Sequence, residues 1–276
     1  MKIIDAQVHI WSQAIIPPGG GHRQVSKLTA QELFAEMDEA GVDAGLIHPP
    51  ASWDPTSNGL AIEAVKKYPD RFAIMGQFPP ENRDNARLIR GWRNQTGMMG
   101  LRWAMLYREQ PRQVKEGEFD WIWAAAEKEG LPVSLQAGVF LAKFRSIAET
   151  HPRLKLIIDH CGQNPFLRDA EAFTNLDELC AIARLPNVAV KATGAPGYST
   201  QAYPFRNLHD GLHRLFNAYG PDRFFWGTDI TRMPCSWRQC VTLFTEELPW
   251  LKGQDLEKVM GRGLCKWIGW NYKFDA

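Results

Sequence analysis

Cysteine is scarce in this sequence, and the few cysteines are not arranged for a disulfide framework. They are odd in number, and no two have the C-x-x-C spacing: Cys161, Cys180, Cys235, Cys240 and Cys265. This pattern disfavours both a disulfide-stapled secreted domain and a thiolate zinc site. We expect reduced and mostly structural cysteines.

The sequence also lacks a long hydrophobic run and an excess of charge of either sign. The first apolar stretch, MKIIDAQVHIW, is interrupted by Asp5, Gln7 and His9, so we expect no signal peptide, no membrane-spanning segment and a cytoplasmic location. The 32 basic and 31 acidic residues give a formal net charge of +1. We therefore expect no nucleic-acid or membrane partner, although a local basic pocket for an acidic substrate stays open.

What is present is the patterning of a globular α/β protein. The chain has 276 residues, of which 45% are hydrophobic and 23% charged, and this suits one barrel-sized domain over residues 1–276. Short apolar runs alternate with segments of helical period, as in repeated βα units. We predict a (β/α)8 TIM-type barrel of the α/β class with strands at 3–10, 44–48, 72–78, 99–103, 132–136, 154–159, 187–191 and 224–228.

Capping signals mark the helices between these strands. Thr29 and Glu32 form a capping-box pattern that opens a helix ending at Gly41. Further helices are predicted at 118–128, 208–219 and 237–247, followed by an extra C-terminal helix at 255–267. Irregular segments are predicted at 12–27, 107–118 and 193–203, on the face where barrel enzymes keep their chemistry.

Each predicted strand ends in a polar side chain, and together these ends should meet at one mouth. The eight residues, in strand order, are His9, His48, Gln77, Arg102, Gln136, His160, Lys191 and Asp229. A buried polar group is costly unless it is paired, so a ring of them indicates a mutually satisfied site. The alternative for any one of them is a strand cap bonded to loop backbone.

The first and eighth strands carry the strongest signals, DAQVH and WGTD. Gln7 and His9 lie two residues apart and therefore share a strand face, and a closed barrel would bring Asp229 beside them. Asp229 has the chemistry of a general base. His9 and His160 could donate hydrogen bonds to a carbonyl oxygen or bind a metal.

These segments resemble the amidohydrolase superfamily, and within it the amidohydrolase-2 family of sugar-lactone, pyrone-dicarboxylate and sulfomuconolactone lactonases. The resemblance covers nearly the whole chain. It rests on the order and spacing of IDAQVHIW, GLRW, LKLIIDHCG, VAVKATG, FFWGTDITR and VMGRGLCKWIGW. It implies hydrolysis of a lactone or related cyclic ester that bears an acidic group, with a carboxylated lactone as the small-molecule partner; a homo-oligomer stays open.

The metal is where this sequence departs from the family pattern. Metal-dependent members open with His-x-His, but here Gln7 replaces the first histidine and Gln136 ends strand five. An amide oxygen is a poor zinc ligand. We therefore favour a site without a cofactor, and a single zinc ion held by His9, His160 and Asp229 is the alternative.

The proposed roles follow from these placements. Asp229 would activate water while His9 and His160 polarise the carbonyl. Arg102 and Lys191 would bind an acidic group, or else pair with a neighbouring acid. The remaining expected substrate contacts are Gln7, His48, Gln136 and Tyr198.

Four alternatives stay open at the level of sequence. His48 could anchor a loop instead of touching substrate, and His22, in a glycine-rich loop, is better explained as solvated than as part of a lid. The enzyme could be a metal-dependent nonoxidative decarboxylase of an aromatic acid, an interpretation that Gln7 weakens. It could also be an inactive barrel that only binds its ligand.

Overall fold

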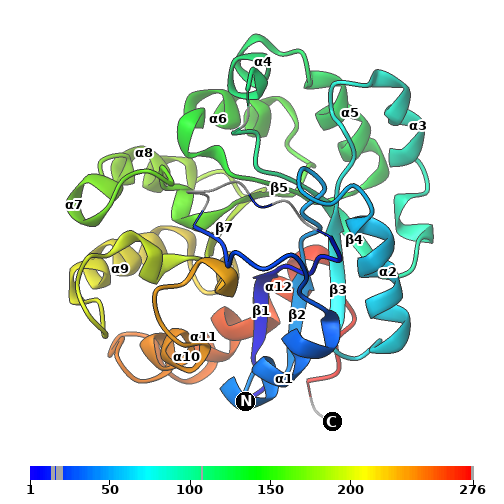
Figure 1. The fold of residues 1–276 in the computed structure, drawn as a ribbon. Helices are drawn as coiled ribbons and strands as arrows, with labels where there is room; N and C mark the ends of the chain where they lie inside the picture. The colour runs from blue at the N-terminus through cyan, green and yellow to red at the C-terminus, as the bar shows by residue number, and fades with distance from the viewer. Residues whose placement is uncertain (14–15, 17–20, 107, 275–276) are drawn as a thin grey trace.

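The computed structural model describes residues 1–13, 16, 21–106 and 108–274. Eight parallel strands follow one another around a barrel in sequence order. Their bounds are β1 Ile4–Val8, β2 Ala44–Ile47, β3 Phe72–Gly76, β4 Met98–Trp103, β5 Val133–Leu135, β6 Leu156–Ile158, β7 Val188–Ala192 and β8 Phe224–Trp226. The predicted (β/α)8 barrel is confirmed (Figure 1).

Asp5 ties the last strand of the barrel to the first. Its carboxylate is fully buried and accepts hydrogen bonds from the backbone N–H of Thr228 at 2.8 Å, the Thr228 hydroxyl at 2.5 Å and the Trp237 indole at 3.0 Å. The backbone N–H of Gln7 donates to the same carboxylate at 2.9 Å. A buried carboxylate needs several donors to offset its desolvation, and here the donors come from both sides of the β1–β8 seam.

Helices surround the strands as an outer layer (Figure 1). The capping box of Thr29 and Glu32 is present at the start of α1, and Gly41 ends that helix in the left-handed conformation. Segment 107–118, expected to be irregular, contains helix α4. The helices are α1 Ala30–Ala40, α2 Ser57–Lys67, α3 Ala86–Ile89, α4 Gln110–Glu116, α5 Asp120–Glu129, α6 Leu141–Thr150, α7 Asp169–Ala172, α8 Leu176–Ile182, α9 His209–Tyr219, α10 Trp237–Thr245, α11 Gly253–Glu257 and α12 Gly263–Ile268.

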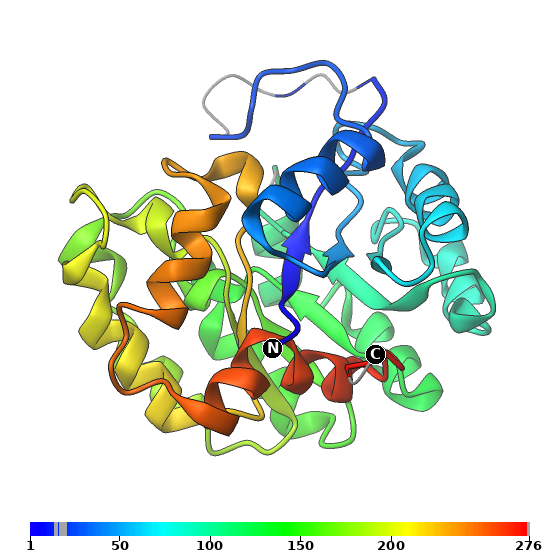
Figure 2. The same ribbon diagram turned by 90° about the horizontal axis from the view of Figure 1, so that it is seen from below.

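The extra C-terminal helix is present but broken in two. A π-helical turn, Lys258–Arg262, separates α11 from α12, so the prediction of one continuous helix over 255–267 is wrong. Gly261 in this turn lies so close to β1 that a Cβ atom would come within 2.9 Å of Ile4. The break lets α12 turn across the amino-terminal end of the barrel (Figure 2).

The hydrophobic core has an inner and an outer part. Inside the barrel, side chains such as Ile4, Leu46, Met75 and Phe225 form one cluster, and α12 closes it from below with Leu264, Cys265 and Ile268. A larger cluster fills the space between the strands and the helices. The carboxyl ends of the strands are left to polar side chains, which positions the site described next.

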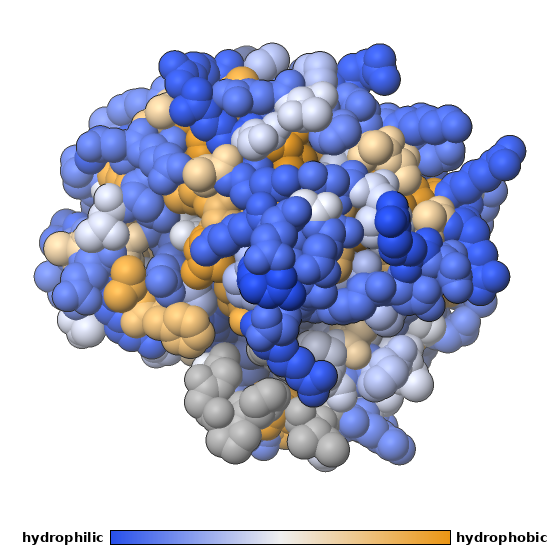
Figure 3. All heavy atoms as spheres, turned by 90° about the horizontal axis from the view of Figure 1, so that it is seen from above, coloured by the Kyte–Doolittle hydropathy of each residue, from blue (hydrophilic) through white to orange (hydrophobic). Residues whose placement is uncertain are grey.

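The face of the molecule shown in Figure 3 is mostly hydrophilic, with apolar side chains scattered singly or in small groups. No helix in the described ranges is long and apolar enough to cross a membrane. The five cysteines are free thiols, as expected.

Candidate active site

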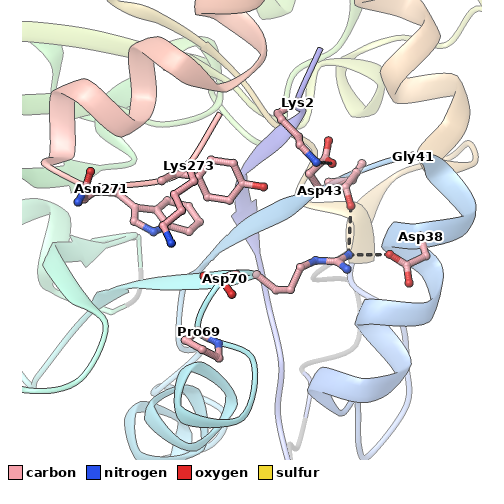
Figure 4. A pocket seen from close by; sticks show the side chains of 12 residues that line it. Lys2, Asp38, Gly41, Asp43, Pro69, Asp70, Asn271 and Lys273 are labelled. Atoms are coloured by element: carbon pink, nitrogen blue, oxygen red, sulfur yellow. Dashed lines mark hydrogen bonds and ion pairs between the residues drawn. The ribbon is translucent and has the colours of Figure 1, made fainter. Parts of the chain in front are cut away.

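Two cavities lie at opposite ends of the barrel. One, of about 610 Å³, lies at the amino-terminal ends of the strands (Figure 4). Its charges largely satisfy one another: Lys2 pairs with Asp43 at 3.2 Å, and Arg71 pairs with Asp38 at 2.7 Å. Active sites of (β/α)8-barrel enzymes lie at the carboxyl ends of the strands, so we place the chemistry at the other end.

The other cavity, of about 450 Å³, opens at the carboxyl ends of the strands. Its wall is built by residues at or after the carboxyl ends of β1, β2, β3, β4, β5, β6 and β8, together with loop residues that cover them. The polar lining residues include Gln7, His9, His22, Gln77, Arg102, Gln136, His160, Arg168, Asp229 and Arg232. This is the mouth that the polar strand ends predict.

Asp229 and His9 form an ion pair on the cavity floor. His9 Nε2 lies 3.0 Å from one carboxylate oxygen of Asp229, and both side chains are nearly inaccessible to solvent. Arg232 and His160 lie farther from the other oxygen, at 3.6 and 3.9 Å. Burial raises the pKa of Asp229, but the charges of His9 and His22 outweigh burial and hold the pKa well below its ordinary value. Asp229 is therefore an ionised proton acceptor.

His160, after β6, and Asp229, after β8, both have unusual backbone conformations. His160 and Asp229 have φ angles of 54° and 55°, in the left-handed region that non-glycine residues rarely adopt. In each case the turn directs the side chain into the cavity immediately after the strand ends. Strained backbone held in this way is common at functional sites.

The protonation of His9 follows from its second nitrogen. His9 Nδ1 lies 2.5 Å from the carbonyl oxygen of His48, and a carbonyl can only accept, so Nδ1 carries a proton. The contact between Nε2 and the Asp229 carboxylate is attractive only when Nε2 carries a proton as well. His9 and Asp229 thus form an imidazolium–carboxylate pair on the cavity floor.

Gln7 stands between His9 and His160. Lys191 donates to Gln7 Oε1 at 2.8 Å, which directs the amide nitrogen to the other side. Gln7 Nε2 lies 3.3 Å from Nε2 of His160 and 3.5 Å from Nε2 of His9. Burial lowers the pKa of His160 to about 3, so this imidazole is neutral, and its Nε2 accepts from the amide.

Asp159 is a buried charged residue that the strand-end pattern did not single out. It pairs with Lys191 at 2.8 Å and with Nε of Arg102 at 2.9 Å, and it accepts from the Ser134 hydroxyl. Burial raises the pKa of Asp159, but Lys191 and Arg102 hold it far below its ordinary value. The ion-pair alternative stated above for Lys191 and Arg102 is therefore present in the structure.

The structure brings most of the predicted site residues to the cavity, but three of them do not line it. Lys191 is completely buried beneath the floor. His48 is also buried, and its Nε2 donates to the Ala6 carbonyl at 3.1 Å, which makes it an anchor for the chain. Tyr198 is only 3% exposed, lies in a short 3-10 turn and is not among the lining residues. Among the described residues its hydroxyl has no partner.

Other residues reach the cavity although they were not expected there. His22, expected in a solvated loop, is half-buried: its Nδ1 lies 2.8 Å from the Thr231 hydroxyl, and its ring packs edge-on against Trp53 at 4.5 Å. Burial lowers its pKa to about 3. Arg168 and Arg232 also line the cavity. Arg232 follows Asp229 by three residues. This short distance from a predicted site residue was the sequence signal that could have pointed to Arg232.

A bound zinc ion does not fit these side chains as they are placed. The expected ligands would be His9, His160 and Asp229, but His9 Nε2 carries a proton that faces Asp229, and the amide nitrogen of Gln7 donates to Nε2 of His160 at 3.3 Å. A cation there would meet hydrogen-bond donors instead of lone pairs. In the described part of the chain, no group of three or more His, Cys, Asp and Glu side chains is arranged to hold a metal ion.

The fold and this cavity together define a class, a (β/α)8-barrel enzyme of the amidohydrolase type. The family comparison is more specific, because the model described as "Amidohydrolase" matches residues 4–272. The chain belongs to the amidohydrolase-2 family. Comparison with curated proteins gave no match.

Solved structures with the same fold are distant in sequence. An amidohydrolase from Burkholderia multivorans with bound zinc is 19% identical, with a TM-score of 0.81 over 98% of this chain and 99% of that chain. A probable 2-pyrone-4,6-dicarboxylic acid hydrolase from Acinetobacter baumannii with citric acid bound is 16% identical, with a TM-score of 0.74 over 98% and 100%. A 2,6-dihydroxybenzoate decarboxylase is 15% identical, with a TM-score of 0.69 over 98% and 99%. Likeness at this level establishes the fold alone.

Proposed function

We propose that this enzyme hydrolyses a lactone or related cyclic ester that bears an acidic group, without a metal ion. The observation that carries the proposal is the ionised Asp229 carboxylate, which lies 3.0 Å from His9 Nε2 on the floor of the cavity at the carboxyl ends of the strands. A base and a hydrogen-bond donor that share one site are what ester hydrolysis by water requires.

Hydrolysis needs one proton removed and one returned. Asp229 takes a proton from water as the water oxygen bonds to the lactone carbonyl carbon, and the N–H at His9 Nε2 donates to the oxygen that becomes negative. The ring C–O bond then breaks, and the leaving alkoxide takes up the proton, which gives a hydroxy acid. When the carbonyl oxygen takes over the hydrogen bond from His9, Asp229 loses its closest partner and becomes a stronger base.

The geometry assigns His160 a smaller part than the sequence suggested. Its Nε2 accepts from Gln7, and its Nδ1 lies 3.0 Å from the Thr193 hydroxyl, so it offers no free N–H to a carbonyl. Gln7 itself lines the cavity and supplies the amide donor on this side. We therefore assign carbonyl polarisation to His9 and Gln7, with His160 holding the Gln7 amide.

Three arginines support an acidic substrate. Arg102 donates the N–H at Nε to Asp159. Its two terminal nitrogens are then available to a ligand in the cavity that this residue lines. Arg232 lies deeper, beside Asp229. Arg168 is exposed at the mouth and pairs with no carboxylate among the described residues. Guanidinium groups bind carboxylates and sulfonates in bidentate fashion, and a neutral lactone would leave them unused.

The test is a panel of γ- and δ-lactones supplied in matched pairs, with and without a carboxylate, and assayed against the native enzyme and Asp229→Asn. We expect the carboxylated members to be preferred and the variant to lose about 10²- to 10⁴-fold in kcat, the usual contribution of a general base. Asp43→Asn, which removes a carboxylate at the opposite end of the barrel, is the matched control.

Three results would reject the proposal. If Asp229→Asn kept its lactonase activity, Asp229 would not be the base. If aromatic acids were turned over and no lactone was, the enzyme would be a decarboxylase. If neither class were turned over but members of the panel bound, the barrel would be a binding protein.

A further inference from the structure

Lys191 is a completely buried lysine that does not touch the cavity. Its ammonium group donates to Asp159 at 2.8 Å and to Gln7 Oε1 at 2.8 Å. A third neighbour, His48 Nε2 at 3.4 Å, already donates to the Ala6 carbonyl and offers no lone pair. Of these three neighbours, Gln7 is the one that itself lines the cavity.

The hydrogen bond from Lys191 decides which way the Gln7 amide faces. An ammonium group only donates, so it must meet the amide oxygen, and the amide nitrogen must then face His160 and His9 at 3.3 and 3.5 Å. A reversed amide would place two donors against the ammonium group and would leave the buried lysine proton unpaired. Gln7 therefore presents N–H groups where a His-x-His pair would present a lone pair.

Positive groups already outnumber carboxylates at the floor without a metal ion. Lys191 and Arg102 carry two positive charges, and Asp159 and Asp229 carry two negative charges, all within the same buried cluster. The His9 imidazolium and Arg232 beside Asp229 add further positive charge. A divalent cation would enter a region that already lacks negative charge to neutralise it, and burial makes that costly.

We propose that Lys191 is a positioning residue that acts through Gln7, and that this lysine–glutamine pair takes the place of a divalent cation in holding His160 beside the protonated His9. The proposal rests on the proposed function, because the pair matters only where these imidazoles serve the reaction. It explains why the chain has Gln7 at the first position of the family's His-x-His pattern. Lys191 and Gln7 act together, and Lys191 itself does not contact the substrate.

The direct test is a zinc titration by isothermal calorimetry, with metal analysis of the dialysed protein. Gln7→Glu has the same shape, but it replaces the N–H donors by a carboxylate oxygen and adds one negative charge. We expect the native chain to retain below about 0.1 zinc per chain and Gln7→Glu to retain about one, as a three-ligand or four-ligand site would. Gln136→Glu is the matched control, since it adds the same charge to the same cavity without a bond to Lys191, and it should behave like the native chain.

A second variant isolates Lys191. Lys191→Met frees the Gln7 amide to turn its oxygen toward the histidines, and we expect zinc affinity to rise about 10- to 100-fold over the native chain. If this variant does not fold, the comparison of zinc binding by Gln7→Glu and Gln136→Glu still tests the proposal. Tight stoichiometric zinc binding by the native chain would overturn the proposal, and so would equal binding by Gln7→Glu and Gln136→Glu. The titration uses zinc alone and no lactone, so it separates this proposal from the lactonase activity.

Discussion

At the scale of single residues, the site depends on which nitrogen of each histidine carries a proton. His9 is fixed by the His48 carbonyl on one side and by Asp229 on the other, and His160 by Thr193 and Gln7. The same ring chemistry thus gives a donor at His9 and an acceptor at His160. Buried imidazoles settle into such defined states because an unsatisfied nitrogen is costly.

The pH dependence of activity follows from Lys191. Burial lowers its pKa to about 8, while Asp159 and Asp229 raise the pKa and Arg102 lowers it further. Below this value the ammonium group holds the Gln7 amide, and above it the hold is lost. We expect kcat/KM to stay level between about pH 5 and pH 7 and to fall as the pH rises through about 8, since kcat/KM reports the free enzyme. His48, which is buried beside Lys191, stays neutral because burial keeps its pKa well below the ordinary value.

A pH–rate profile of Gln7→Glu assigns this limb. A carboxylate beside Lys191 raises the lysine pKa, so the falling limb should move to higher pH in Gln7→Glu and stay in place in Gln136→Glu. If the limb did not move in Gln7→Glu, the titrating group would be another one.

At the scale of elements, the broken C-terminal helix determines how the amino-terminal end of the barrel is covered. Gly261 allows the turn Lys258–Arg262 to lie against β1, and α12 then covers the inner core with Leu264, Cys265 and Ile268. The packing of α12 at the amino-terminal end supports Ile4, which lies on the same strand as Gln7, and His9 directly follows this strand. Packing at one end of β1 thus sets the position of the chemistry at its other end.

Gly261→Ala tests this closure. The new Cβ would come within 2.9 Å of Ile4, and we expect a loss of about 1–3 kcal/mol in the free energy of unfolding, the usual result of overpacking. Gly59→Ala is the control, because it lies in α2 with nothing within 4 Å of its added Cβ and should gain about 0.5–1 kcal/mol. Thermal melts of both variants decide: equal shifts would mean that the contact with Ile4 does not matter.

At the scale of the whole molecule, patterning and turn chemistry predicted the barrel well. Apolar runs that end in polar residues gave the eight strands, and the capping box of Thr29 and Glu32 gave the start of α1. The break at Gly261 could not be read because it depends on contact with Ile4, more than 250 positions away along the chain. Local sequence carries no record of such a contact.

The same limit applied to the site. Strand ends placed His9, His160 and Asp229 at one cavity, since their positions follow from topology. Lys191 was expected at the wall, yet it points beneath the floor to Asp159, because pairing with a buried acid depends on the layers inside the barrel. Arg168 and His22 lie on loops, whose course over the mouth has no periodic signal.

The central claim is that the native chain hydrolyses an acidic lactone with its own side chains and no metal ion. The most direct measurement is kcat/KM for a carboxylated lactone, taken on enzyme dialysed against a strong chelator and again after one equivalent of zinc is added. The account predicts the same kcat/KM within about twofold in both samples, because Asp229 and His9 supply the base and the donor. Loss of turnover after chelation, with recovery on addition of zinc, would contradict it.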